Sequence, residues 1–197
     1  MQTRSRVFRM VALAMLSALA FLLMLLNFPL PGLPPFLKMD FSEIPVLIGA
    51  IIFGPVGGII VEALKNLLHY FITGSSFGVP LGEASNFVTG LFLVLPVAFV
   101  ANKVRTKKGL ASGLLIGIAL SSVMMAFLNY LILLPLYTVF LDFPSFSAAA
   151  RMKLAVIGVL PFNLIRGGLT GILFLFLYPK IKSLIDRWNP LTTSNVS

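Results

Sequence analysis

The sequence predicts an all-α integral membrane protein in which six transmembrane helices form one bundle, with a long external loop between the first and second helices. Three observations lead to this fold class. The 197 residues are 58% hydrophobic and only 11% charged, their mean hydropathy is +1.02, and apolar runs recur along the chain. We expect residues 1–188 to form a single domain and residues 189–197 to form a polar C-terminal tail.

The first expected span follows three arginines, so the N-terminus resembles a signal peptide. Its apolar run is longer than a signal core, and we interpret it as an uncleaved helix. Ala14 and Ala18 lie one turn apart on it and form a small-residue pair that lets another helix approach closely. The six expected spans are about 10–28, 44–53, 57–73, 82–101, 109–137 and 153–179.

The connection after the first span is unusually long. Four prolines between residues 29 and 35 prevent the first helix from continuing. Long ordered loops are often functional, and the apolar content of this one indicates that it packs against the bundle. Its central residues are Leu37, Lys38, Met39, Asp40 and Phe41.

The second span is short, because at 1.5 Å per residue it covers only ~15 Å, about half the hydrocarbon thickness. It therefore either extends further or crosses incompletely. Gly54 then predicts a turn, and Pro55 is suited to begin the third helix.

The third span carries a polar stripe, because its four polar side chains are three or four positions apart. These side chains either contact a ligand or serve as internal contacts that include an ion pair. A site with several histidines is impossible with a single histidine, and we expect no metal. The residues are Glu62, Lys65, Asn66 and His69.

The last span contains polar residues at a depth where a charge costs at least ~2–3 kcal/mol, so such a group normally faces a cavity or a partner. Asn163 and Arg166 are three positions apart and project from one face. Asn129 of the fifth span lies at a similar depth, ~12–15 Å below the outer edge, and Asn86 of the fourth span is shallower. We infer a pocket in the outer half of the membrane; the alternative is a polar cluster that only holds helices together.

The basic residues predict the orientation. Three precede the first span, four occupy 103–108 and three follow residue 179, so one side carries ten of the fifteen. The positive-inside rule makes that side cytoplasmic, with both termini, in a multi-pass protein of the plasma membrane. The net charge of +9 thus reflects topology in a lipid bilayer and not nucleic-acid binding.

Catalytic motifs are absent from the sequence. It has no phosphate-binding loop, no cysteine and no paired carboxylates at helical spacing. We therefore assign no catalytic residues. The alternative from another class is a membrane-embedded enzyme that uses Glu62, Lys65 and His69.

Six motifs occur in order along the chain: FLKMDFSEIP at 36–45, FGPVGG at 53–58, LKNL at 64–67, GEASNF at 82–87, LNY at 128–130 and PFNLIRG at 161–167. Together they resemble the riboflavin-specific S component, the substrate-binding subunit of energy-coupling factor (ECF) vitamin transporters. The similarity covers about residues 8–185. The resemblance implies a bundle that captures riboflavin from outside the cell, with riboflavin as transported ligand and no cofactor. It also implies a transmembrane coupling subunit and two ATPase subunits as partners.

The resemblance also implies roles for individual residues. The two ring-binding asparagines of the family correspond to Asn129 and Asn163, and its usual lysine in the last motif is Arg166 here. The loop at 37–41 would close over the ligand, Asn86 and Lys65 fall within two further motifs, and the face with Ala14 and Ala18 would contact the coupling subunit. The nearest alternative is an S component for a different vitamin.

Overall fold

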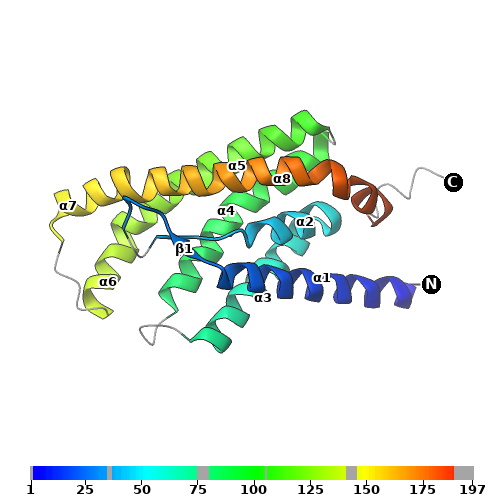
Figure 1. Ribbon diagram of the computed structural model, residues 1–197, viewed down its shortest axis with the longest axis horizontal. Coiled ribbons are helices and arrows are strands. Elements are labelled where there is room, and N and C mark those ends of the chain that lie inside the picture. The colour runs from blue at the N-terminus through cyan, green and yellow to red at the C-terminus, as the bar shows by residue number, and fades with distance from the viewer. Residues whose placement is uncertain (1, 35–36, 75–79, 105, 141–145, 189–197) are drawn as a thin grey trace.

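The computed structural model describes residues 2–34, 37–74, 80–104, 106–140 and 146–188. Over these residues the chain is almost entirely helical, in six continuous stretches (Figure 1). The predicted C-terminal tail, and residues 75–79 between the third and fourth expected spans, lie outside the described residues. The stretches are α1 (Gln2–Leu25); α2 (Glu43–Phe53); α3 (Pro55–Thr73); α4 (Leu81–Val104); α5 (Lys107–Leu128) with η1 (Asn129–Leu133) and α6 (Leu134–Phe140); and α7 (Ala148–Lys153) with η2 (Leu154–Val159) and α8 (Leu160–Trp188).

Four of the described helical stretches are long and apolar enough to cross a membrane, by length and composition. They begin in α1, α4, α5 and α7. The other two differ for separate reasons: α2 has only 11 residues, and α3 carries the buried polar residues Glu62, Lys65 and Asn66. As predicted, Pro55 is the first residue of α3.

Several predicted loop boundaries were wrong because the helices extend further than the apolar runs. The basic segment 102–108 is largely helical, since α4 continues to Val104 and α5 begins at Lys107. Thr106 caps α5 by accepting a hydrogen bond of 3.0 Å from the Gly109 backbone N–H. Likewise, α7 begins at Ala148, before the sixth expected span, and α8 continues through Pro179, where that span was expected to end.

The connection between α1 and α2 contains two short strands that the sequence did not predict. β1 (Phe28–Pro29) and β2 (Lys38–Met39) pair antiparallel, with Phe28 opposite Met39. Its proline-rich backbone lacks the N–H groups that a helix needs. The pairing fixes the segment that leads into α2.

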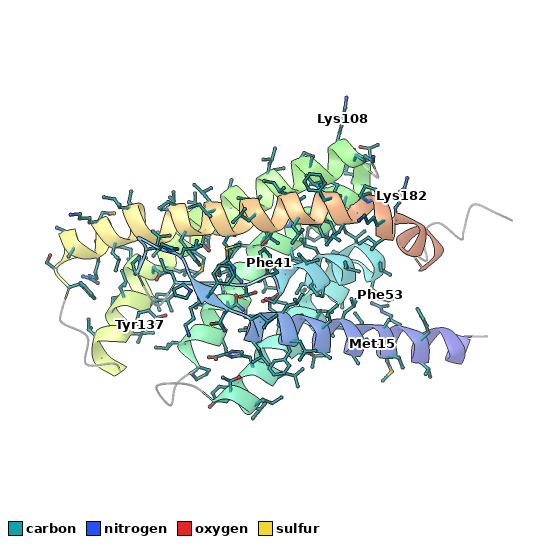
Figure 2. The ribbon with its side chains drawn as sticks, in the orientation of Figure 1. Met15, Phe41, Phe53, Lys108, Tyr137 and Lys182 are labelled. Atoms are coloured by element: carbon teal, nitrogen blue, oxygen red, sulfur yellow. The ribbon has the colours of Figure 1, made fainter. Side chains whose placement is uncertain are left out.

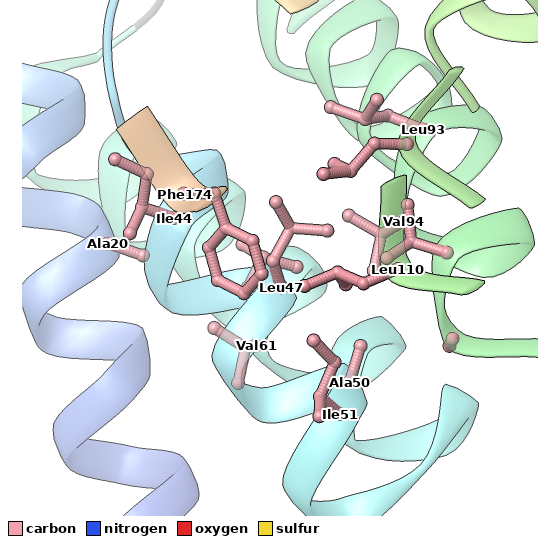
Figure 3. Close-up of a cluster of buried hydrophobic side chains, with 14 of the residues drawn as sticks. Ala20, Ile44, Leu47, Ala50, Ile51, Val61, Leu93, Val94, Leu110 and Phe174 are labelled. Atoms are coloured by element: carbon pink, nitrogen blue, oxygen red, sulfur yellow. The ribbon is translucent and has the colours of Figure 1, made fainter. Parts of the chain in front are cut away.

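α2 is the central helix of the core. Eight of its eleven residues are buried. Figure 3 shows Leu47 and Ala50 of α2 surrounded by Val61 of α3, Leu110 of α5 and Phe174 of α8. A short apolar helix enclosed on all sides does not need to span the bilayer, because its backbone hydrogen bonds are internal and protein covers it.

α4 and α5 pack closely through small residues of α5. A Cβ atom at Gly117 would collide with the Leu93 carbonyl oxygen of α4, and one at Gly113 would lie 3.0 Å from the Val97 Cα atom. Small residues four positions apart let two helix backbones approach each other in this way.

A closed ring of polar side chains, all buried except the partly buried Asn86, ties α2, α3, α4 and α8 together, and we call it the polar ring. Lys65 Nζ lies 2.8 Å from Glu43 Oε1 and 2.8 Å from Glu62 Oε2. Glu62 Oε1 accepts from Asn66 Nδ2 at 2.9 Å, Asn66 Oδ1 accepts from Asn86 Nδ2 at 3.2 Å, and Asn86 Oδ1 accepts from Arg166 Nη2 at 2.8 Å. Arg166 Nη2 closes the ring at 3.4 Å from Glu43 Oε1. The members are Glu43, Glu62, Lys65, Asn66, Asn86 and Arg166.

The close approach of α4 and α5 predicts that Gly117→Ala destabilises the protein by about 1–3 kcal/mol, because the added methyl group overpacks the interface. Gly168→Ala is the matched control, since a Cβ atom there meets no atom within 4 Å. The control should be neutral or slightly stabilising through helix propensity. Thermal unfolding in detergent measures both, and equal midpoints for the two variants would contradict the packing assigned to Gly117.

The polar ring predicts that Lys65→Met destabilises the protein by about 3–5 kcal/mol, because two buried carboxylates lose their shared cation. The double variant Glu62→Gln/Lys65→Met removes one charge of each sign and should recover much of that loss. Unfolding midpoints of the two variants, compared with the unsubstituted protein, test this. A double variant no more stable than the single one would show that charge pairing is not what Lys65 provides.

Candidate ligand-binding site

A cavity of about 450 Å³ lies within the bundle. Its volume is in the usual range for small-molecule sites. Leu37, Lys38 and Asp40 line it, together with parts of α1, α3, α4, α5, η1, α6, η2 and α8. The cavity therefore lies among five of the six helical stretches, and the short core helix α2 does not line it.

Three polar residues singled out in the sequence line this cavity and are themselves buried. Asn129 of η1 and Asn163 and Arg166 of α8 all line it, and their exposed fractions are 3%, 5% and 7%. Asn129 is the first residue of a π-helical turn, a distortion that often occurs at functional sites. A second π-helical turn, η2, directly precedes the helix that carries Asn163.

The two asparagines are oriented in the same way by their own helices. Asn129 Nδ2 donates to the Met125 carbonyl at 2.9 Å, and Asn163 Nδ2 donates to the Val159 carbonyl at 2.8 Å. Within the described residues neither Oδ1 atom has a hydrogen-bond donor. Each amide therefore offers an acceptor oxygen and one remaining N–H to a solute.

Arg166 belongs both to the cavity lining and to the polar ring. Its Nη2 atom lies 2.8 Å from Asn86 Oδ1 and 3.4 Å from both Asp40 Oδ2 and Glu43 Oε1. Asn86 also lines the cavity. The guanidinium is a fixed donor whose charge is already balanced by carboxylates.

The segment at 37–41 divides between the cavity and the core. Leu37, Lys38 and Asp40 line the cavity. Met39 is 1% exposed and packs in an apolar cluster with Phe162, and Phe41 packs against the same cluster. The cavity lining does not include Met39 or Phe41, which lie behind it.

Asp40 connects this segment to α8. Burial raises the pKa of its carboxyl group, but the charges of Arg166 and Lys65 and the hydrogen bonds from Ser42 outweigh burial, and the pKa lies below its usual value. Asp40 is therefore ionised when it contacts Arg166.

Lys65 lies outside the cavity lining. It is completely buried, and besides its two carboxylate contacts it donates to Ser42 Oγ at 3.0 Å. These contacts confirm the internal Glu62–Lys65 ion pair that the sequence left as one of two alternatives.

Several other polar residues line the cavity besides those assigned to the ligand site from the sequence. His69 Nδ1 and Glu83 Oε1 lie 3.0 Å apart and join α3 to α4 at the cavity. Thr89 and Tyr137 also line it. The polar stripe of the third span pointed to His69. Nothing in the sequence pattern distinguishes Thr89 and Tyr137 from the other residues of their helices.

Ala14 and Ala18 lie away from the cavity, on the exposed face of α1. Ser17 and Leu13 of the same helix are buried at 1% and 6% exposure and form its inner face. The small-residue pair therefore faces outward from the bundle.

Comparisons with known proteins agree with this architecture. A family profile described as "ECF transporter, substrate-specific component" matches residues 8–178. The riboflavin transporter FmnP of Bacillus subtilis is 47% identical over 92% of this chain and 96% of its own length. The riboflavin transporter RibU of Staphylococcus aureus is 40% identical over 91% of this chain and 93% of its own.

A solved structure, of the S component of a bacterial ECF transporter, is also similar to this chain. It superposes with a TM-score of 0.78 at 36% sequence identity, over 91% of this chain and 98% of that one. The family and these relatives are transporters, which removes the enzyme alternative. Because the family profile covers most of the chain and the relatives match over nearly their whole length, this protein belongs to the family of ECF transporter substrate-specific components.

Proposed function

We propose that this protein is a riboflavin-binding subunit of a bacterial membrane transporter, and that the 450 Å³ cavity holds the vitamin. The observation that carries the proposal is the buried group of Asn129, Asn163 and Arg166, which lies beside an apolar wall. The likeness to two riboflavin transporters over more than nine-tenths of this chain supports the same ligand.

The chemistry of the site suits the ring of a flavin. The polar edge of that ring is an imide, in which an N–H group lies between two carbonyl oxygens. The amide oxygens of Asn129 and Asn163 are acceptors for the N–H, and the Arg166 guanidinium is a donor for a carbonyl. The apolar remainder of the ring would lie against Leu37, Met125 and Phe162.

The orientation of the bundle follows from its basic end. α1 begins and α8 ends at one end of the bundle (Figure 1), and Figure 2 shows Lys108 and Lys182 there, with Tyr137 of the cavity lining at the other end. The positive-inside rule then assigns the basic end to the cytoplasm. In this orientation the cavity opens outward, and the segments 26–34 and 37–42 belong to the external connection that covers the ligand.

The partners follow from the family and from the exposed face of α1. We propose that this S component delivers its ligand through a transmembrane coupling subunit and two ATPase subunits. Ala14 and Ala18 are exposed and one helical turn apart, so they allow a helix of the coupling subunit to approach closely.

The proposed ligand predicts that the protein purified from flavin-containing medium carries bound riboflavin and quenches the fluorescence of added riboflavin. Fluorescence titration in detergent measures this directly. Thiamine and biotin should not displace the flavin. A protein that neither retains flavin nor quenches its fluorescence, or that releases it to another vitamin, would remove the assignment.

The geometry of the buried amides predicts that Asn163→Ala weakens riboflavin binding by about 1–3 kcal/mol, because a buried hydrogen bond to the ring is lost. Leu164→Ala is the matched control, since Leu164 is the next residue of α8 and is 43% exposed. The same titration measures the dissociation constant of riboflavin for both variants. Equal constants for the two variants would place Asn163 outside the binding site.

A further inference from the structure

A second, much smaller cavity of about 10 Å³ adjoins the ligand cavity, and Thr89, Asn163 and Arg166 line both. Glu43 of α2, Ser121 of α5 and Thr170 of α8 complete its polar lining. A space of this size corresponds to a single water molecule.

Three buried polar atoms around this space have no hydrogen-bond partner among the described residues. They are Glu43 Oε2, Arg166 Nε and Thr170 Oγ1. The residues that carry them are 1%, 7% and 0% exposed. Buried polar groups are normally paired, and an unpaired one costs about 1–3 kcal/mol. Three residues that line one small cavity therefore each carry a buried polar atom that a polar ligand in the cavity could pair.

We propose that this cavity is a binding site for one water molecule, held by Glu43, Arg166 and Thr170. A water molecule can donate to Glu43 Oε2, accept from the Arg166 Nε–H group and exchange a hydrogen bond with the Thr170 hydroxyl. A metal cation does not fit the same atoms. The positively charged guanidinium repels a cation, and the Arg166 Nε atom carries a hydrogen and offers no lone pair for coordination.

The water site gives Thr170 a function in ligand binding. The Nη2 atom of Arg166 is held by Asn86, Asp40 and Glu43, and the water holds the Nε edge. The guanidinium is thus held at two of its nitrogen atoms, Nη2 and Nε, in the orientation in which it faces the ligand cavity. Thr170 is a positioning residue, because it acts on the ligand only through the water and Arg166. This role rests on the proposed binding of riboflavin, whereas the water site itself does not.

The first test is a crystal structure of the ligand-free protein at a resolution that shows ordered water. We expect one water within hydrogen-bond distance of Glu43 Oε2, Arg166 Nε and Thr170 Oγ1. No density there, or density with the coordination of a metal ion, overturns the site. This result is independent of riboflavin, so a protein that binds no flavin refutes the proposed function and leaves the water site to be decided by density.

The second test uses Thr170→Val, which removes the hydroxyl and keeps the shape. Riboflavin should bind about three- to tenfold more weakly, the loss of roughly one hydrogen bond. Thr170→Ser keeps the hydroxyl and should bind like the unsubstituted protein. Thr138→Val is the matched control, because Thr138 donates to Pro135 O within its own helical segment and lines neither cavity.

Unfolding midpoints of the three variants separate a folding defect from a positioning effect. Should Thr170→Val not fold, the comparison of Thr170→Ser with the unsubstituted protein and the density at the site still decide the proposal. Unchanged affinity in a folded Thr170→Val variant, or weakened affinity in Thr170→Ser, overturns the positioning role.

Discussion

The structure depends on pairing buried charges inside an apolar bundle. Lys65, Glu43 and Glu62 are at most 1% exposed, and each would be very costly to bury alone. The contacts of Glu43 with Lys65 and with Arg166 require a particular arrangement of α2, α3 and α8, because these three residues come from different helices. The polar ring therefore selects one packing of these helices among the many that apolar surfaces alone would allow.

The same ring forms part of the cavity wall. Arg166 and Asn86 belong to both, so the groups that a ligand meets are already held by contacts made for the fold. Groups fixed before binding lose little freedom when the ligand arrives, which favours affinity. Since carboxylates already balance the charge of Arg166, the wall offers hydrogen bonds more than net charge, as a neutral solute requires.

The outer surface has the opposite character. Large apolar side chains such as Leu22, Phe127 and Phe176 are more than half exposed, while the polar residues that bring function lie inside. Small residues such as Gly117 allow close helix contacts where lipid provides no hydrophobic force between helices. The site is thus formed by packing and polar contacts inside the bundle, and the exterior presents apolar side chains that are suited to lipid.

The sequence alone determined the helical class, the order of the helices, the start of α3 at Pro55 and the motifs that indicate the family, because helix signals and apolar runs are local. It also selected Asn129, Asn163 and Arg166, since polar groups within apolar helices are conspicuous. Only the tertiary structure decided that Lys65 serves the polar ring, that Met39 and Phe41 pack behind the cavity, and that the first connection contains a strand pair. These outcomes depend on where helices cross, and contacts such as that of Arg166 with Asp40 join residues 126 positions apart, a separation that no local pattern encodes.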